Sequence, residues 1–351
     1  MRISTIVNKE EKRVAITPGV IGKYLSMGIE VVIPSDIGRD AGYSDEEYVA
    51  AGASIWKEKS IPDAEIYACI HPPLLCNFRS GSYLIALLTS FRNRKIVERL
   101  RSRGVHLCAL EKIPRISRAQ SMDVLSSQAN VAGYRAALEA LVEYQRVVPL
   151  MMTAAGTIRP ARVLVLGAGV AGLQAIATAK RLGASVSALD VRVTAKEQVE
   201  SLGARFIDVG ISTNGETAGG YAKEMDIDYQ ERQADKLRQV VPQVDIVITT
   251  AQIPGKPAPK LISEDMVRSM SSGSVIVDMA TESGGNCVLS EKGKVIRVGD
   301  VTIVGRTDFA ARVAHDSSQL FARNVFNFVS LMLKNGEIDI SDEIIQATIA
   351  P

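Results

Sequence analysis

The stretch from Arg162 to Gly172, RVLVLGAGVAG, decides the fold class of this chain. The apolar run RVLVL predicts a buried strand, and LQAIATAKRLGA, which follows the glycines, predicts a helix. Gly167, Gly169 and Gly172 between them form the pattern GxGxxG, which allows a tight turn, a close approach to a pyrophosphate and close packing of the helix on the strand. The helix N-terminus offers free N–H groups to phosphates. This stretch therefore predicts a dinucleotide site in a doubly wound fold.

The end of the next predicted strand supports this interpretation. SVSALD closes with Asp190, where the dinucleotide fingerprint expects an acidic residue. A carboxylate there accepts hydrogen bonds from the ribose hydroxyls of NAD and repels the additional phosphate of NADP. Arg192 follows two residues later and could accept that phosphate, so NAD is favoured while NADP stays open. The alternative is a glycine-rich turn in a doubly wound fold that binds no nucleotide.

Two further segments are expected at the same edge of the sheet. Gln252 and Gly255 follow the predicted strand DIVITT, and Glu282 follows the predicted strand SVIVD. Ligands of open α/β sheets bind outside the carboxyl ends of the strands, so we expect these residues to reach the cofactor. Plain surface turns are the alternative for both segments.

A long glycine-rich loop, GISTNGETAGGYAKEMDIDY, follows the third predicted strand of this region. Crossover loops in such folds usually have ~2–6 residues. The sequence leaves two interpretations open, a disordered insertion or a lid that closes on the nucleotide with Gly220 and Tyr221 at the contact.

Strand-like and helix-like segments alternate along all 351 residues, which predicts an α/β fold with parallel sheets. We expect two doubly wound, Rossmann-like domains joined by long helices, with a cleft between them. The N-terminal domain is expected to comprise residues 1–130 and 315–351, and the NAD(H)-binding domain residues 131–314.

Two long helices are predicted to connect these domains. The first runs from Ser126 to about Arg146, and a second near the C-terminus leads into the tail EIDISDEIIQATIAP, which is expected to add an edge strand. The residues recurring at helical spacing are Val131, Tyr134, Leu138, Leu141 and Val142 in the first helix, and Leu320, Phe321, Val325, Phe328, Val329 and Met332 in the second.

Composition narrows the class of protein. A net charge of +2 gives no argument for nucleic acid as a partner. The four cysteines contain no CxxC pair and the three histidines are far apart, so we predict neither a disulfide framework nor a metal site. The N-terminus lacks the apolar core of a signal peptide and is too rich in glutamate for a transit peptide. No run approaches the ~18 apolar residues of a membrane span, and we expect a cytoplasmic protein.

The segment PRISRAQSMD, residues 114–123, is dense in hydrogen-bonding side chains but contains no histidine, cysteine or lysine. It could orient a ligand, but it could not easily take up a proton. Hydride transfer between two nicotinamides goes from carbon to carbon and needs distance and orientation rather than an acid or a base. The alternative is a polar turn that caps the long helix.

Nearly the whole chain resembles the NAD(H)-binding component, domain I, of proton-translocating nicotinamide nucleotide transhydrogenase. The matching segments are KEEKRVAITP, PRISRAQSMD, GAGVAGLQAIATAKRLGA, ETAGGYAKEM, TTAQIPGKPAPKLI and SVIVDMATESGGNC. The resemblance implies a homodimer on the cytoplasmic side of the inner membrane, held there by its partners. Such a component binds NADH and passes hydride to NADP on a separate component, while a membrane component couples the transfer to proton movement. Many alpha subunits continue into membrane helices, so this sequence is either a separate subunit or a fragment.

The resemblance also implies roles for individual residues. Arg115, Gln120 and Asp123 would surround the nicotinamide end with Ser126 close by, and Gln120 would hold the NADH nicotinamide near that of the partner. The remaining contacts would be Val170 at the pyrophosphate turn, Asp190, Val191 and Arg192 at the adenosine ribose, and Tyr221 in the long loop.

Alanine dehydrogenase is a relative with the same two-domain layout, and it is the alternative function. Arg13, within EKRVAITP, resembles the arginine that can pair with the substrate carboxylate in that family. The lysine and histidine that alanine dehydrogenases use after their third and fourth strands are missing, and Glu282 stands in place of an aspartate. His71 could substitute, but a lone histidine at a strand end is more often structural. A nucleotide-binding regulatory protein without turnover is the third class left open.

Overall fold

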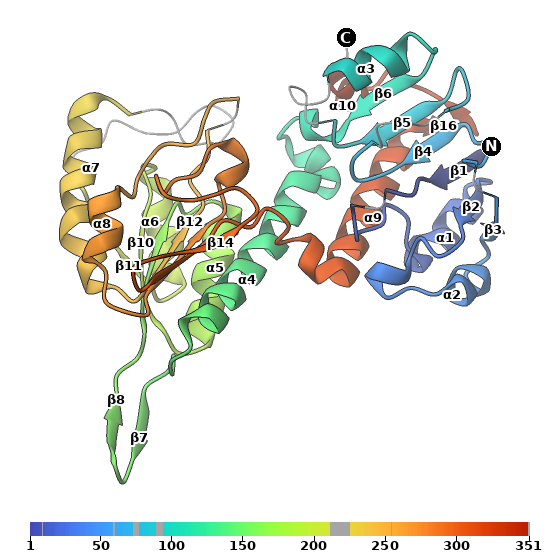
Figure 1. Ribbon diagram of the computed structural model, residues 1–351. Helices are drawn as coiled ribbons and strands as arrows, with labels where there is room; N and C mark the ends of the chain where they lie inside the picture. The colour runs from blue at the N-terminus through green and yellow to red at the C-terminus, as the bar shows by residue number, and fades with distance from the viewer. Residues whose placement is uncertain are drawn as a thin grey trace. The chain divides into compact units, whose positions relative to one another are not determined.

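The computed structural model describes residues 1–8, 10–58, 60–72, 77–88, 94–210, 225–253 and 255–349 of the chain. The fold comprises two compact units (Figure 1). Unit 1 consists of Met1–Gln128 and Ala310–Pro351, and unit 2 of Ala129–Phe309.

Unit 1 is built on a six-stranded parallel sheet with the order β3-β2-β1-β4-β5-β6. The chain starts in the middle of the sheet and runs outward in both directions, so the strand order reverses between β1 and β4. The strands are β1 (Arg2–Thr5), β2 (Glu30–Pro34), β3 (Ser54–Trp56), β4 (Ile66–Ala68), β5 (Tyr83–Ala86) and β6 (His106–Ala109).

Helices cover both faces of this sheet. One face packs Ile3, Ile33 and Ile85 against helices α1, α9 and α10, and the other packs Leu84 and Leu107 against α3. The helices of unit 1 are α1 (Pro18–Ser26), α2 (Asp45–Ala50), α3 (Arg94–Arg101), α9 (Ala314–Met332) and α10 (Glu343–Thr348), with short 3-10 turns at Arg39–Ala41, Leu110–Lys112, Ser117–Met122 and Ala311–Val313.

The end of the chain corrects one prediction. The tail forms helix α10 rather than an edge strand of the six-stranded sheet, and its contact with that sheet is a one-residue antiparallel bridge between Ile349 and Cys108 of β6. The Asp342 carboxylate accepts a hydrogen bond from the Ile344 N–H and caps this helix at 2.9 Å. A cap followed by helix-forming residues outweighed the β-branched pattern that suggested a strand. A short β-hairpin, formed by β16 (Leu333–Lys334) and β17 (Glu337–Ile338), precedes α10.

Unit 2 is built on a seven-stranded sheet with the order β11-β10-β9-β12-β13-β15-β14. All neighbours are parallel except β14, which pairs antiparallel with β15 at the edge. The strands are β9 (Arg162–Leu166), β10 (Ser185–Leu189), β11 (Arg205–Phe206), β12 (Ile246–Thr249), β13 (Val275–Asp278), β14 (Val295–Val298) and β15 (Val301–Val304). The order reverses between β9 and β12, which repeats the arrangement of unit 1. The predicted parallel α/β fold is therefore confirmed.

Alternate residues of β9 point to opposite faces of this sheet. Val163 and Val165 pack under α4, α5 and α6, whereas Leu164 and Leu166 pack under α7 and α8. The helices are α4 (Val124–Tyr144), α5 (Val170–Arg181), α6 (Thr194–Ser201), α7 (Ile227–Val240) and α8 (Glu264–Ser269), with 3-10 turns at Val241–Gln243 and Thr281–Ser283. Figure 1 shows α7 and α8 together on one side of the sheet.

The buried side of α4 differs from the predicted apolar face. Val142 is 70% exposed and Tyr134 is 40% exposed. Val131 is buried and Leu141 packs against the core as predicted, but small residues line this side as well: a Cβ on Gly133 would overlap the carbonyl oxygen of Ala171, and Ala136, Ala137 and Ala140 are buried. Close approach of the helices selects small side chains, which a search for large apolar residues does not detect.

A short hairpin in unit 2, β7 (Met151–Thr153) and β8 (Gly156–Ile158), was not predicted. It extends away from the rest of its unit (Figure 1). All of its strand residues are exposed.

Candidate functional site

The glycine turn between β9 and α5 has the geometry that its sequence predicts. Gly167 has a φ of +93°, a left-handed conformation, and a Cβ there would lie 2.7 Å from Thr250 Oγ1. A Cβ on Gly172 would overlap the carbonyl oxygen of Gly167, so helix and turn touch backbone to backbone. Gly169 is the N-cap of α5 and provides no side-chain cap. The first N–H groups of α5 therefore have no side-chain cap, and uncapped N–H groups at a helix N-terminus are suited to a phosphate.

Asp190 lies at the end of β10 and its carboxylate holds this turn. Oδ2 accepts a hydrogen bond from the Ala168 N–H at 2.7 Å, which ties the turn to the neighbouring strand. Oδ1 accepts from the Arg192 N–H at 2.8 Å. The Arg192 guanidinium binds both carboxylate oxygens, through Nε to Oδ1 and Nη2 to Oδ2, each at 2.9 Å. The Asp190 side chain is only 4% exposed and that of Arg192 is 15% exposed.

Val170 and Val191 lie beside these groups. Val170, the first residue of α5, is 39% exposed, and Val191 is half-buried between Asp190 and Arg192. An apolar surface next to the turn suits the non-polar faces of a nucleotide.

The loop after β12 is tied to the glycine turn and to the loop after β13. Thr250 Oγ1 donates to the carbonyl oxygen of Gly167 at 2.9 Å. The fully buried Asn286 donates to the carbonyl oxygens of Ala251 and Pro259 and accepts from the Ala251 N–H. Thr250 and Asn286 were not predicted as site residues, although Thr250 is the last residue of the predicted strand DIVITT and Asn286 follows a glycine pair. They set the shape of this edge of the sheet.

Asp278, at the end of β13, holds the next loop from inside. Its carboxylate accepts from Thr249 Oγ1 at 3.0 Å, from the Ala280 N–H at 3.0 Å and from the Cys287 N–H at 2.9 Å. Glycine is required at Gly285, where φ is +81° and a Cβ would lie 2.8 Å from Asp278 Oδ2. These contacts fix the loop between Asp278 and Cys287.

The predicted cofactor residues of these two loops are exposed. Gln252 Nε2 lies 3.5 Å from the Met279 carbonyl oxygen, and Gly255 has a φ of +75°. Glu282 lies in a 3-10 turn, with its Oε1 3.6 Å from Lys292 Nζ. The carboxyl edge of the unit 2 sheet thus brings together Gly167, Gly169, Gly172, Asp190, Val191, Arg192 and Gln252. Gly220 and Tyr221 lie outside the described residues.

Two titratable groups of unit 2 keep their protons at neutral pH. Burial raises the pKa of Tyr229 to about 12, and the charges of Asp190 and Asp208 act in the same direction. Burial also raises the pKa of the Cys287 thiol. Neither group is suited to proton transfer near neutral pH.

The segment 114–123 in unit 1 is anchored to α9 and α10, and most of its side chains are exposed. The Ser121 carbonyl oxygen accepts from Asn324 and Asn327 of α9, at 2.8 and 3.0 Å. Arg118 pairs with Asp342 and Glu343 at the start of α10, at 2.7 and 3.0 Å. Arg115 and Gln120 are exposed. The anchored backbone holds them in defined positions.

Asp123 and Ser126 are brought together at the start of α4. Asp123 Oδ1 accepts from the Ser126 N–H at 2.9 Å and Oδ2 accepts from its hydroxyl at 2.5 Å. Asp123 therefore caps the helix, which is the structural role considered for this segment.

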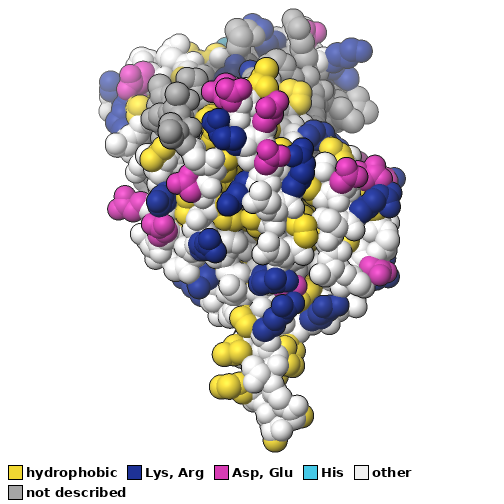
Figure 2. Space-filling model, turned by 90° about the vertical axis from the view of Figure 1, so that its left-hand side faces the viewer, with side chains coloured by type: hydrophobic (Ala, Val, Ile, Leu, Met, Phe, Trp, Pro, Cys, Tyr) yellow, Lys and Arg dark blue, Asp and Glu magenta, His cyan; other side chains and the backbone are white. Residues whose placement is uncertain are grey.

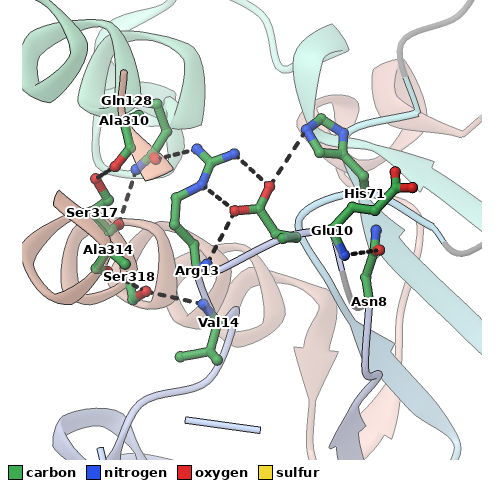
Figure 3. A network of polar contacts seen from close by, with 11 residues as sticks. Asn8, Glu10, Arg13, Val14, His71, Gln128, Ala310, Ala314, Ser317 and Ser318 are labelled. Carbon is green, nitrogen blue, oxygen red and sulfur yellow. Dashed lines mark hydrogen bonds and ion pairs between the residues drawn. The ribbon is translucent and has the colours of Figure 1, made fainter. Parts of the chain in front are cut away.

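A buried polar network occupies the loop between β1 and α1 in unit 1 (Figure 3). Glu11 binds Arg13 at two points, with its Oε1 2.8 Å from Nε and its Oε2 2.8 Å from Nη2. Arg13 Nη1 donates to Gln128 Oε1 at 2.7 Å, and Gln128 donates to the Ser317 carbonyl oxygen at 3.0 Å. His71, after β4, has its Nε2 3.9 Å from Glu11 Oε2.

In this network the Arg13 guanidinium forms a buried ion pair with Glu11. The side chains of Arg13 and Glu11 are only 10% and 11% exposed. Burial opposes ionisation of Glu11, but its hydrogen bonds with Arg13 and the charges of Arg13 and His71 outweigh it and lower its pKa. Glu11 is thus an internal carboxylate that is bound by the Arg13 guanidinium.

Two family models match the chain along almost its full length. The model described as "Alanine dehydrogenase/PNT, N-terminal domain" matches residues 5–132, and "Alanine dehydrogenase/PNT, C-terminal domain" matches residues 136–350. The chain belongs to the alanine dehydrogenase/PNT family. The predicted relationship is confirmed, and the Rossmann-like units are those of an NAD-binding oxidoreductase family.

Within the alanine dehydrogenase/PNT family, transhydrogenase subunits are the more similar relatives. The chain is 49% identical over 332 residues to the first of the polypeptides that make up the NAD(P) transhydrogenase alpha subunit of Rhodospirillum rubrum, covering 91% of this chain and 86% of that protein. A solved transhydrogenase from Sinorhizobium meliloti is 42% identical, with a TM-score of 0.90 over 99% of this chain and 98% of that one. Alanine dehydrogenase of Bacillus subtilis is 28% identical over 286 residues, covering 80% of this chain and 70% of that protein. The comparisons therefore favour a transhydrogenase subunit over an alanine dehydrogenase. Within the described ranges, no helix is long and apolar enough to cross a membrane.

Proposed function

We propose that this chain is the NAD(H)-binding component of a proton-translocating NAD(P) transhydrogenase. It binds NADH and passes hydride directly to NADP+ held by a separate component. A membrane component couples this transfer to proton translocation, and the chain lies on the cytoplasmic side of the inner membrane through these partners. The observation that carries the proposal is the 49% identity with a transhydrogenase alpha subunit over 91% of the chain.

The glycine turn supplies the binding half of this function. The N–H groups at the start of α5 hold the pyrophosphate, while Gly167, Gly169 and Gly172 allow its close approach. Val170 lies at this turn, and Asp190, Val191 and Arg192 form the ribose side of the site. Further contacts come from Gln252, Gly255 and Glu282 at the carboxyl edge, and from Gly220 and Tyr221.

The segment 114–123 supplies the positioning half. The nicotinamide of NADH donates hydride from carbon to carbon, so the surrounding residues need only set distance and orientation. The exposed Gln120 and Arg115 orient the nicotinamide, and the Asp123–Ser126 pair fixes the backbone that carries them.

The engagement of Arg13 argues against alanine oxidation. Its guanidinium already binds Glu11 and Gln128, and releasing it would leave a buried carboxylate without its partner. The described residues of the segment 114–123 contain no group that takes up a proton near neutral pH, which an amine dehydrogenase requires.

Two assays test the proposed function. After fluorescence titration has shown NADH binding, the purified chain is given NADH, pyruvate and ammonium, and no NADH consumption is expected. Hydride exchange is expected once the NADP(H)-binding component is added. Consumption by the chain alone would establish alanine dehydrogenase, and binding without exchange in the complete mixture would establish the regulatory class.

A variant of the positioning loop sharpens this test. Gln120→Ala should lower the hydride exchange rate by roughly a hundredfold, because a small misplacement of reacting groups costs that much. NADH affinity should change little. Ser117→Ala, an exposed residue of the same loop, is the matched control and should leave both quantities unchanged.

The hairpin β7–β8 supports the proposal that the chain forms a homodimer. Leu150, Met152 and Ile158 are 57%, 76% and 44% exposed. Figure 2 shows hydrophobic side chains along this projection. A lone two-stranded hairpin is only marginally stable in water, and a cluster of exposed apolar side chains marks an interaction site.

The dimer is tested by light scattering. Met152→Asp should shift the chain from dimer to monomer. Val49→Asp, at a 55% exposed apolar residue of α2 in unit 1, is the control and should leave the dimer intact. A wild-type monomer, or a dimer that tolerates Met152→Asp, would contradict the assignment of the hairpin.

A further inference from the structure

The carboxylate of Asp190 has no acceptor position left for a ribose. Each oxygen accepts two hydrogen bonds: Oδ1 from the N–H and Nε of Arg192, and Oδ2 from the Ala168 N–H and Arg192 Nη2. A carboxylate has about four lone-pair positions. The residue that the fingerprint assigns to the ribose hydroxyls is thus fully engaged within the chain.

Two of these four hydrogen bonds are fixed and two can be released. The N–H groups of Ala168 and Arg192 belong to the backbone of the turns that Asp190 holds. The bonds from Nε and Nη2 come from the Arg192 side chain, which also has a further partner in the protein, and a change of its rotamer would break both bonds. Rotation of that side chain would free one position on each oxygen, which matches the two donors of a ribose 2′,3′-diol.

We propose that Arg192 occupies the ribose-diol position of the nucleotide site and competes with the nucleotide for Asp190. The inference rests on the proposed NAD(H)-binding function and deepens it. Binding of NADH exchanges two charge-assisted hydrogen bonds from the guanidinium for two from the ribose hydroxyls. The affinity for NADH is therefore lowered by the ion pair that must open.

The same exchange discriminates against NADP(H). A 2′-phosphate leaves only the 3′-hydroxyl as a donor, so one freed carboxylate oxygen gains no hydrogen bond. The phosphate also carries negative charge toward Asp190, and a like-charge contact of this kind disfavours binding. Only a full diol replaces both hydrogen bonds of Arg192, so the pairing with Arg192 masks part of the preference of Asp190 for NADH.

The test uses Arg192→Met, which keeps most of the apolar stem and removes the charged head. NADH affinity, measured by fluorescence titration, should rise about threefold to tenfold, the size of a modest ion pair converted to an equilibrium constant. NADPH affinity should not rise to the same extent. A lysine cannot bind both carboxylate oxygens in one plane, so the NADH affinity of Arg192→Lys should lie between those of Arg192→Met and the wild type.

Arg162→Met is the matched control. Arg162 also pairs with a buried aspartate: its Nε is 3.3 Å from Oδ2 of Asp245, but it stands at the beginning of β9, away from the glycine turn. Its substitution should leave NADH affinity unchanged. Circular dichroism melting of each variant shows whether it is folded.

Different results would contradict the NAD(H)-binding function and the competition between Arg192 and the nucleotide. A wild-type chain that does not bind NADH would remove the proposed function. Binding by the wild type with equal or weaker binding by Arg192→Met would overturn the inference alone, since Arg192 would then be a simple contact. An equal gain for NADH and NADPH would show that Arg192 does not mask the preference of Asp190 for NADH.

Discussion

The two units of this chain share one topology and differ in their first turn. Both sheets follow the order 3-2-1-4-5-6 in their parallel strands, with helices on both faces. In unit 2, β9 passes into α5 through the short turn Gly167–Gly169, and the helix N-terminus opens onto the strand ends. In unit 1, residues 6–17 separate β1 from α1, and Glu11 and Arg13 fill the loop.

This difference shows that strand order alone does not make a nucleotide site. The reversal of strand order creates an edge where a ligand can bind, but the first turn determines whether a phosphate can reach the helix N-terminus. Unit 1 places a buried ion pair beside its reversal point, where Glu11 also approaches His71 from β4. In unit 2 the first turn itself consists of glycine and alanine backbone, and the buried ion pair of Asp190 and Arg192 lies beside it.

The largest expected effect comes from breaking the ion pair of unit 1. Glu11→Ala leaves the Arg13 charge buried, and losing one partner of such a pair costs about 3–5 kcal/mol. Urea unfolding should show this loss, with NADH affinity unchanged in the folded protein. Glu264→Ala, which removes the exposed partner of Arg268, is the control and should cost about 0–1 kcal/mol. A parallel loss of NADH affinity would show that the two first turns do not act independently.

The second largest effect is expected when a side chain is added to the glycine turn of unit 2. Gly172→Ala places a Cβ on the Gly167 carbonyl oxygen, and overpacking of this kind costs about 1–3 kcal/mol. NADH affinity should fall by roughly tenfold to a hundredfold because the turn must shift. Gly22→Ala in α1 is the matched control, since a Cβ there meets nothing within 4 Å. Unchanged NADH titration of the Gly172 variant would refute the role of the turn.

A third, smaller effect comes from the link between the turn and β12. Thr250→Val removes the hydroxyl that binds the Gly167 carbonyl oxygen, at a cost of about 1 kcal/mol. NADH affinity should fall severalfold. Thr250→Ser restores the hydroxyl and should restore the affinity; failure of that rescue would assign the effect to packing.

The smallest effect is a pH dependence confined to unit 1. The pKa of Glu11 is lowered from 4.5 on folding, so its contribution to stability is full above that value. The contribution is lost as the pH falls through the lower pKa of the folded state. Urea midpoints measured downward from pH 6 should therefore fall more steeply for the wild type than for Glu11→Gln. If the urea midpoints of the two proteins fell equally steeply with pH, Glu11 would not be the group whose ionisation stabilises unit 1.

The sequence predicted the strands and helices of both sheets because their periodicity is local. At α4 it predicted the helix and the burial of Val131 but missed the packing of Gly133 and its neighbouring alanines. At the tail it missed the helix that the Asp342 cap starts. The glycines of the turn could be predicted from their spacing. The ion pairs of Asp190 with Arg192 and of Glu11 with Arg13 could not be predicted, because side-chain rotamers in irregular loops leave no periodic pattern in the sequence.

The most direct test of the central claim is the number of NADH molecules bound per chain, measured by calorimetric titration of the purified protein. If the first turn rather than the topology creates the site, one NADH binds per chain, and Gly172→Ala weakens that single site. Two sites per chain would show that unit 1 also binds nucleotide, and would contradict the account.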